Sequence, residues 1–347
     1  MQFIKPGINI NFIGGRKIAF YLSIALLFIS FSSLIIHKGP RYGVDFAGGT
    51  LIQVKFLSPT NIDDIKSGLD TIDMGKSSVQ LFGDPEENEY LIRTDKSVST
   101  GEGYSHKVGA ALKTATGNDV DIRRVEMVGP QVGKDLREKA LFAMFYALLF
   151  ITIYISGRFE SEWFKSGVMA GGLIFCVYSL SSFDVSIPFL IAAALVITLV
   201  LFWFLKLKYA MGAIVALLHD VIITVGVFSI FDKEFSLPII AALLTIIGYS
   251  LNDTIIVFDR IRENLKKYHK NTLDVTINKS INETLNRTVL TSLTTLVVVI
   301  TLFVLGGGII HDFAFAMIVG IVIGTYSSIY VASPILLVWQ EYEKRRK

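Results

Sequence analysis

The stretch GYSLNDTIIVFDR (248–260) places the amide of Asn252 and the carboxylate of Asp253 directly after the apolar run LPIIAALLTII. Together the two stretches have the length of one membrane-spanning helix. A carboxylate at the centre of such a helix costs about 3 kcal/mol on insertion scales, and charged residues kept there usually serve ion or proton movement. Asp253 is therefore a candidate for proton transfer, with Asn252 as a supporting polar group.

A second candidate, Arg287, precedes the apolar segment 288–306, and Thr291 lies one turn further along the same helix face. Asp253 comes 15 residues after Pro238, which is about 22 Å along a helix, so it reaches the inner half of a bilayer. Arg287 enters the membrane from that same side. The spacing predicts that Asp253 and Arg287 approach each other.

The chemistry expected of such a pair is proton exchange. Burial disfavours an ionised carboxylate, and a nearby guanidinium favours it. A carboxylate balanced between these two effects gains or loses a proton when its partner moves. The alternative is a fixed ion pair that only holds two helices together, and the sequence leaves both interpretations open.

Two further pairs of polar residues have simple structural interpretations beside the functional one. His219 and Asp220 lie near the middle of the predicted span 209–231, where they either support proton movement or hydrogen-bond to adjacent helices. Asp259 and Arg260 lie at the inner end of their helix. We interpret them as solvated charges at the membrane interface.

The elements that must position these residues are apolar segments. Of the 347 residues, 52% are hydrophobic, and they are grouped in runs rather than scattered. Each run has roughly the 20 residues that a bilayer core requires, so the chain is expected to be a polytopic α-helical membrane protein. The predicted spans are 17–36, 138–157, 163–182, 186–205, 209–231, 237–258, 288–306 and 313–338.

Lys and Arg gather on one side of these spans. With the N-terminus inside and the spans alternating, the short outside loops 183–185, 232–236 and 307–312 hold only Lys233. The positive-inside rule then places both termini in the cytoplasm. The inside segments contain Lys5, Arg16, Lys17, Arg158, Lys165, Lys206, Lys208, seven basic residues from Arg260 to Arg287, and the tail KRRK.

Residues 37–134 form the one long segment predicted outside the membrane on the far side. Its pattern gives a strand at 49–57, a helix at 61–73, strands at 77–83 and 89–95, a helix at 105–116 and a strand at 119–128. The order strand–helix–strand–strand–helix–strand is that of the ferredoxin-like split βαβ unit. We therefore expect one extracytoplasmic α+β domain of this type.

The sequence carries no motif of a soluble enzyme. It has no Walker loop and no Cys/His metal cluster, and its single Cys rules out an internal disulfide. We expect no enzyme activity, no cofactor and no nucleic-acid partner. Energy is then expected from a partner or from the membrane, since one charge moving through 100 mV releases about 2.3 kcal/mol, and protons would be the coupling ion.

Five motifs resemble the SecF family, the smaller membrane subunits of bacterial SecDF protein-export complexes in the RND superfamily. They cover nearly the whole chain in the order of the family, and their combination is highly specific. The motifs are GVDFAGGT (43–50), VGPQVGKDLREKA (128–140), GAIVALLHDVIITVG (212–226), LLTIIGYSLNDTIIVFDRIREN (243–264) and SINETLNRTVLTSLTTL (280–296).

The resemblance implies a function and a set of partners. A protein of this family pairs with a SecD subunit, works with the SecYEG channel in the bacterial inner membrane, and uses the proton-motive force to help exported, unfolded polypeptides across. It also implies an RND-type helix bundle embedded in membrane lipid. The proton-path carboxylate and arginine of the family correspond to Asp253 in SLNDTI and Arg287 in TLNRTV.

One departure from the family pattern is an apparent insertion of two apolar spans at about 161–207. Two extra crossings leave the topology of the remaining spans unchanged, and we expect the pair at the lipid-facing periphery. The full set of expected segments is a cytoplasmic N-terminus (1–16), a first span (17–36), a periplasmic domain (37–134), a second span (138–158), the inserted pair (161–207), a four-helix core (209–338) with a cytoplasmic loop (259–287), and a cytoplasmic tail (339–347).

Two other functions remain open at this point. The chain could be half of an RND-type exporter of a small molecule or lipid, although such exporters usually carry larger paired outer domains. It could also be a scaffold without transport activity, in which Asp253 and Arg287 are purely structural. Transport of a small substrate without a SecD-like partner would favour the first, and retained function after exchanging the two residues would favour the second.

Overall fold

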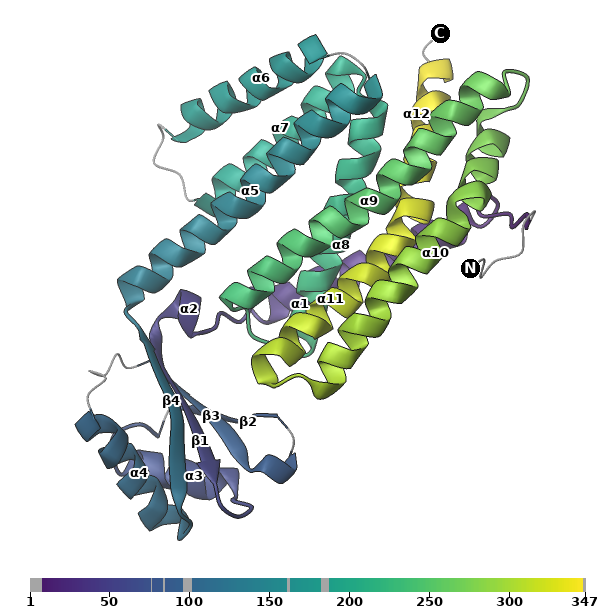
Figure 1. Ribbon diagram of the computed structural model, residues 1–347. Coiled ribbons are helices and arrows are strands. Elements are labelled where there is room, and N and C mark those ends of the chain that lie inside the picture. The colour runs from purple at the N-terminus through teal and green to yellow at the C-terminus, as the bar shows by residue number, and fades with distance from the viewer. Residues whose placement is uncertain are drawn as a thin grey trace.

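The apolar segments fold into long helices that lie side by side, and the polar segment between the first two forms a small sheet domain at one end of them (Figure 1). The computed structural model describes residues 8–75, 77–83, 85–95, 102–160, 163–181 and 187–345. Parts of the predicted tails (1–7 and 346–347) and the predicted outside loop 183–185 lie outside these residues.

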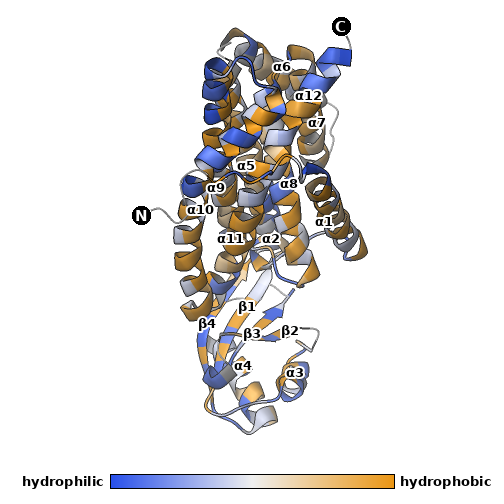
Figure 2. Ribbon diagram, turned by 90° about the vertical axis from the view of Figure 1, so that its right-hand side faces the viewer, coloured by the Kyte–Doolittle hydropathy of each residue, from blue (hydrophilic) through white to orange (hydrophobic). Residues whose placement is uncertain are grey.

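Within the described residues, six helical stretches are long and apolar enough to cross a membrane. The last of them runs through α11, a π-helical turn and α12 without a break. These elements are α1 (Arg16–Ile36), α5 (Pro130–Glu160), α8 (Lys208–Ile230), α9 (Leu237–Lys267), α10 (Leu273–Leu305), α11 (Gly308–Ser327), the π-helical turn η2 (Ser328–Ala332) and α12 (Ser333–Arg345). In Figure 2, apolar residues dominate these helices, and hydrophilic residues gather at the bundle end far from the sheet.

The helices extend beyond the apolar runs that predicted them. The predicted loop 259–287 is mostly helical, because α9 continues to Lys267 and α10 already begins at Leu273. Hydropathy marks the part of a helix that contacts lipid, whereas the backbone hydrogen bonds continue into polar sequence until a capping signal ends them. Arg287 therefore lies well inside α10 rather than at its start.

The helices α6 (Trp163–Ser181) and α7 (Ile187–Leu205) correspond to the two inserted segments. They pack against each other and against α5, and α7 also contacts α8 (Figure 1). Many of their apolar side chains are exposed, including Phe164, Phe175 and Phe204. The apolar part of α7 that is long enough to count, Ile191–Leu205, is shorter than the six spanning stretches, so two additional crossings stay a prediction.

The small domain contains a four-stranded antiparallel sheet with the strand order β2-β3-β1-β4. Alternate residues of β1, such as Ile52 and Val54, are fully buried against Leu69 of α3 and Leu112 of α4. The predicted order of strands and helices is present. The elements are β1 (Gly49–Phe56), α3 (Ile62–Asp70), β2 (Ser78–Leu81), η1 (Pro85–Glu87), β3 (Glu89–Thr94), α4 (Glu102–Thr116) and β4 (Val120–Val128).

A short junction joins the sheet domain to the bundle. It consists of α2 (Val44–Ala47) and two glycines with positive φ, Gly48 at 78° and Gly49 at 124°. A Cβ at Gly49 would lie 2.3 Å from the carbonyl oxygen of Thr94, and one at Gly48 would lie 2.7 Å from Cα of Pro130. The two glycines therefore let β1, β3 and the start of α5 meet.

The loop between α8 and α9 connects this junction to the end of the bundle nearest the sheet domain. Phe235 exchanges backbone hydrogen bonds with Arg41 and Gly43, at 2.7 Å each. The carboxylate of Glu234 forms ion pairs with the guanidinium groups of Arg93 and Arg41. Burial and the nearby Arg41 lower the pKa of Arg93 to about 10, so Arg93 stays cationic at neutral pH.

Replacing Gly49 by alanine should weaken the sheet domain more than the same change at Gly83. Both have a positive φ, which costs a residue with a Cβ about 1–2 kcal/mol. Only Gly49 would also push a Cβ into backbone, since the nearest atom to a Cβ at Gly83 is the flexible carboxylate of Glu87 at 3.4 Å.

The measurement is amide hydrogen exchange of β1 and β3 in the full-length protein. Gly49→Ala is expected to lower their opening free energy by about 2–4 kcal/mol in total, and Gly83→Ala by about 1–2 kcal/mol. Equal losses in the two variants would show that the close approach to Thr94 contributes nothing.

Candidate functional site in the helical bundle

The carboxylate of Asp253 lies inside the bundle, in the second half of α9, and is only 1% exposed. Its Oδ2 atom lies 3.5 Å from the hydroxyl of Ser292 on α10, which in turn lies 2.7 Å from the hydroxyl of Thr325 on α11. Its Oδ1 atom has no hydrogen-bond partner among the described residues. Asp253 is thus a buried carboxylate that is only weakly hydrogen-bonded.

The hydroxyl of Thr288 shares this property. It lies one helical turn before Ser292 on α10, is buried, and has no hydrogen-bond partner within the described chain. Leaving a buried polar atom unpaired costs about 1–3 kcal/mol, so native proteins rarely keep one without a role. Asp253 and Thr288 are therefore two buried polar side chains, one on α9 and one on α10, that each keep an oxygen without a hydrogen-bond partner among the described residues.

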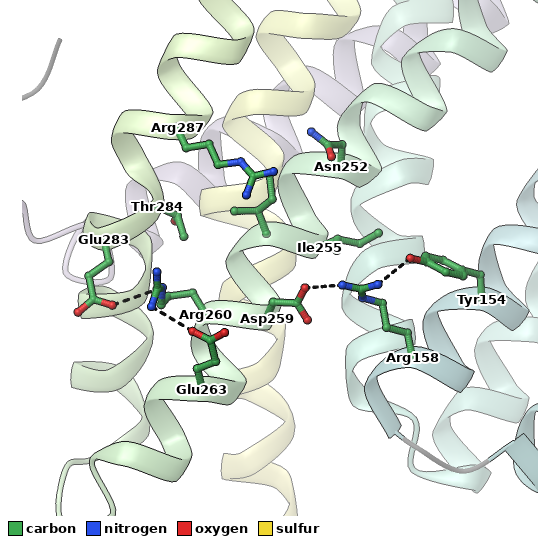
Figure 3. Close-up of a pocket in the computed structure, with 11 residues that line it drawn as sticks. Tyr154, Arg158, Asn252, Ile255, Asp259, Arg260, Glu263, Glu283, Thr284 and Arg287 are labelled. Carbon is green, nitrogen blue, oxygen red and sulfur yellow. Dashed lines mark hydrogen bonds and ion pairs between the residues drawn. The ribbon is translucent and has the colours of Figure 1, made fainter. Parts of the chain in front are cut away.

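The side chains of Arg287 and Asn252 lie in a different environment. Both line a cavity of about 620 Å³ between α5, α9 and α10 (Figure 3). Successive residues of a helix are rotated by about 100°. Asn252 and Arg287 therefore face the cavity, while their neighbours Asp253 and Thr288 face the interior.

The predicted approach of Arg287 to Asp253 is consequently not a direct ion pair. No nitrogen of Arg287 lies within 4 Å of a carboxylate oxygen among the described residues, and Arg287 is exposed. The hydroxyl of Thr291, predicted to share the face of Arg287, donates within its own helix to the carbonyl oxygens of Arg287 and Thr288. The two predicted residues thus lie on adjacent helices without forming a direct ion pair.

The predicted interface charges lie at the wall of the same cavity and are paired there. Asp259 accepts a hydrogen bond of 2.8 Å from Arg158 of α5, and Arg260 lies 3.0 Å from Glu263 and 3.6 Å from Glu283 (Figure 3). The sequence indicated only that Arg158 is one of the basic residues of the inside segments. Its pairing with Asp259 could not be predicted, because the two residues are 101 positions apart.

His219 and Asp220 lie within a second buried site, between α1, α8, α9 and α11. Nδ1 of His219 lies 2.9 Å from Oδ1 of Asp220. Oδ2 of Asp220 accepts hydrogen bonds from Ser250 at 2.5 Å and from Ser327 at 2.7 Å. Asp220, with none of its surface exposed, is therefore hydrogen-bonded through both oxygens, unlike Asp253.

Small residues bring the helices of this second site together. A Cβ at Gly324 of α11 would lie only 2.9 Å from Cβ of Ser250 on α9. The close contact places Ser250 and Ser327 on the same oxygen of Asp220. Neither serine was singled out from the sequence, because an isolated serine in an apolar helix gives no signal of its partner.

Comparisons with known proteins identify the family. The family profile "Protein export membrane protein SecD/SecF, C-terminal" matches residues 107–185 and 183–342, and "SecD/SecF GG Motif" matches 33–56, which includes the junction glycines. The protein translocase subunit SecF of Magnetococcus marinus is 43% identical, covering 100% of this chain and 97% of that protein. The chain belongs to the SecF family.

Other SecF proteins and a solved structure agree with this assignment. SecF of Vibrio alginolyticus is 41% identical over 97% of this chain and 91% of its own length. The crystal structure of SecDF from Thermus, described as a translocon-associated membrane protein, is 30% identical with a TM-score of 0.70. It matches 96% of this chain, and this chain spans 39% of that longer one.

Replacing Thr288 of this SecF protein by valine should raise the free energy of unfolding by about 1 kcal/mol, because valine fills the same space without an unpaired hydroxyl. Thr276 provides a matched control on α10, since its buried hydroxyl donates to the carbonyl oxygen of Thr272. Denaturant unfolding in detergent micelles measures both. If Thr288→Val destabilises the protein as much as Thr276→Val, the Thr288 hydroxyl has a partner after all.

Proposed function

We propose that this SecF protein is an accessory subunit of Sec-dependent protein export that is driven by the proton-motive force and acts with a SecD subunit beside the SecYEG channel. The observation that carries the proposal is the state of Asp253, a buried carboxylate in the second half of a long apolar helix, with one oxygen that has no partner among the described residues. A group of this kind gains stability from binding a proton and is expected to take one up.

The proposed coupling uses a proton on Asp253 and the charge of Arg287. An ionised Asp253 attracts the guanidinium of Arg287 on the neighbouring helix, whereas a protonated Asp253 does not. Proton binding and release would therefore change how α9 packs against α10. One charge crossing the membrane at 100 mV supplies about 2.3 kcal/mol for such a change, without a cofactor or nucleotide.

We place the protein in the bacterial inner membrane with both termini in the cytoplasm. The sheet domain lies at one end of the bundle, and the helix ends that carry Arg158, Lys267 and Arg345 lie at the other (Figures 1 and 2). The positive-inside rule assigns the basic end to the cytoplasm. In this proposal α6 and α7 add two crossings at the lipid-facing edge.

The sheet domain is then periplasmic, and we infer that it is ferredoxin-like. Its order β4-β1-β3-β2, with all neighbouring pairs antiparallel and two helices on one face, supports this assignment. On this side of the membrane it would meet the exported, unfolded polypeptide. The SecD subunit would supply the parts of the longer SecDF chain that this chain does not match.

Asp253→Asn tests the proposal, because an amide keeps the size of the side chain but cannot exchange a proton. In cells where this chain replaces the resident SecF, the variant should lower proton-dependent export of a secreted reporter to the level of cells without SecF. Co-purification with SecD should be unchanged.

Asp259→Asn is the matched control on the same helix, since its ion pair with Arg158 lies at the partly exposed cavity wall and contributes about 0–1 kcal/mol. It should retain most export. Full export by Asp253→Asn would contradict the proposed function. Equal loss in both variants would show that any charge change on α9 is harmful and would remove the special role of Asp253.

A further inference from the structure

The hydrogen bonds around His219 form one continuous chain of four. Nδ1 of His219 lies 2.9 Å from Oδ1 of Asp220, and Nε2 lies 3.1 Å from the hydroxyl of Ser23 on α1. That hydroxyl lies 3.1 Å from the phenol oxygen of Tyr326 on α11. The phenol donates its proton to the carbonyl oxygen of Ala19 at 2.7 Å. The chain ends on an acceptor that can never donate.

This fixed end determines the direction of every bond in the chain. Tyr326 has one proton and gives it to Ala19, so the bond between Tyr326 and Ser23 must use the proton of Ser23. Ser23 has then no proton left for His219. The bond between Ser23 and Nε2 of His219 therefore requires a hydrogen on Nε2.

The remaining bond, between Nδ1 of His219 and Asp220, also needs a proton. It can sit on Nδ1, which makes the ring a cation beside a carboxylate, or on Oδ1 of Asp220, which makes both groups neutral. A neutral imidazole beside an ionised Asp220 has one proton too few and leaves one of the four bonds unmade. In both complete arrangements the pair has no net charge.

The surroundings favour this neutral pair. His219 is 4% exposed and Asp220 is 0% exposed. The groups that face the pair are the hydroxyls of Ser23 from α1, Ser250 from α9 and Ser327 and Tyr326 from α11. Among the described residues, the hydrogen-bond partners of the pair include no Lys or Arg, so an unprotonated pair would leave a buried negative charge without a counter-charge.

We infer that His219 and Asp220 together hold one proton beyond those of a neutral imidazole and a carboxylate, and so form a second proton-holding site in this subunit. The occupancy follows from the hydrogen bonds alone. Only its use in transport rests on the proposed function.

The second site is linked to the first through two helices. Ser250, which donates to Asp220, lies on α9 one turn before Asp253. Ser327, which donates to the same oxygen, lies on α11 two positions after Thr325, the partner of Ser292. A shift of α9 or α11 that removes a donor from Asp220 would make its negative charge costlier and hold the proton more tightly. The proton affinity of the pair is thereby coupled to helix movement.

Nuclear magnetic resonance of ¹⁵N-histidine-labelled, full-length protein in lipid bilayers tests the occupancy. The signal of His219 is assigned by its loss in His219→Gln. At pH 8 we expect hydrogens on both ring nitrogens, or one on Nε2 together with a protonated Asp220 in the infrared carbonyl region. A ring with a single hydrogen beside an ionised Asp220 would overturn the inference.

Tyr326→Phe provides the sharper comparison. Without the phenol, the proton of Ser23 becomes free to point at Nε2, so a neutral imidazole no longer loses a bond. The pair should then release its proton at a pH lower by about one unit, a tenfold change in proton affinity. Ser33→Ala is the matched control, since Ser33 joins α1 to Ser229 of α8 away from the pair. An unchanged release pH in Tyr326→Phe would contradict the proton count.

These outcomes separate this inference from the proposed function. If the pair is unprotonated while Asp253→Asn still abolishes export, the inference fails and the proposed function stands. If the pair is protonated while Asp253→Asn exports normally, the proposed function fails and the proton assignment stands.

Discussion

The structure depends on one constraint, which is that the core of a bilayer offers no hydrogen-bond partner to a buried polar group. Each polar side chain of the bundle must find its partners on neighbouring helices. Asp220 finds three, from α8, α9 and α11. Asp253, on the helix next to it, finds one long contact among the described residues and keeps an oxygen without a partner there. We therefore assign stable proton binding to the site of Asp220, whose oxygens are both hydrogen-bonded. Asp253, which is not fully hydrogen-bonded, is the group suited to changing its protonation state.

The rotation of neighbouring residues on a helix gives α9 and α10 two different faces. Asn252 and Arg287 face a polar cavity, whereas Asp253 and Thr288 face the interior. At its N-terminal end, α9 begins against the junction of the sheet domain, where the backbone amide of Leu237 donates to Asp45. The same rigid helix therefore connects the domain proposed to lie outside the membrane with the carboxylate proposed to bind protons inside it.

Local signals in the sequence predicted much of this architecture. The local sequence pattern of residues 37–134 located the strands and helices of the small domain, because each element is set by its own residues. Hydropathy located the long helices but not their ends, since polar helical turns continue past the lipid-contacting part. Asp253 was singled out because a carboxylate is rare in an apolar run.

The partners of these residues could not be predicted in the same way. Ser23 and Tyr326 contact His219 across 196 and 107 positions of sequence, and nothing in an isolated serine or tyrosine indicates such a contact. The expected approach of Arg287 to Asp253 was placed on the correct pair of helices. Whether the two side chains face each other depends on a difference of one residue, or about 100°, in the rotation of each helix. The sequence pattern does not resolve a difference of this size.

The central claim is that the buried polar groups of this bundle carry protons and do not merely hold helices together. Proton flux through the reconstituted protein tests it most directly. The protein is inserted with its SecD partner into vesicles that contain a pH-sensitive dye, and a membrane potential is imposed. We expect proton entry that rises with the potential and exceeds that of vesicles of the same lipid without protein. Equal proton entry in both vesicle preparations at every potential would contradict the claim.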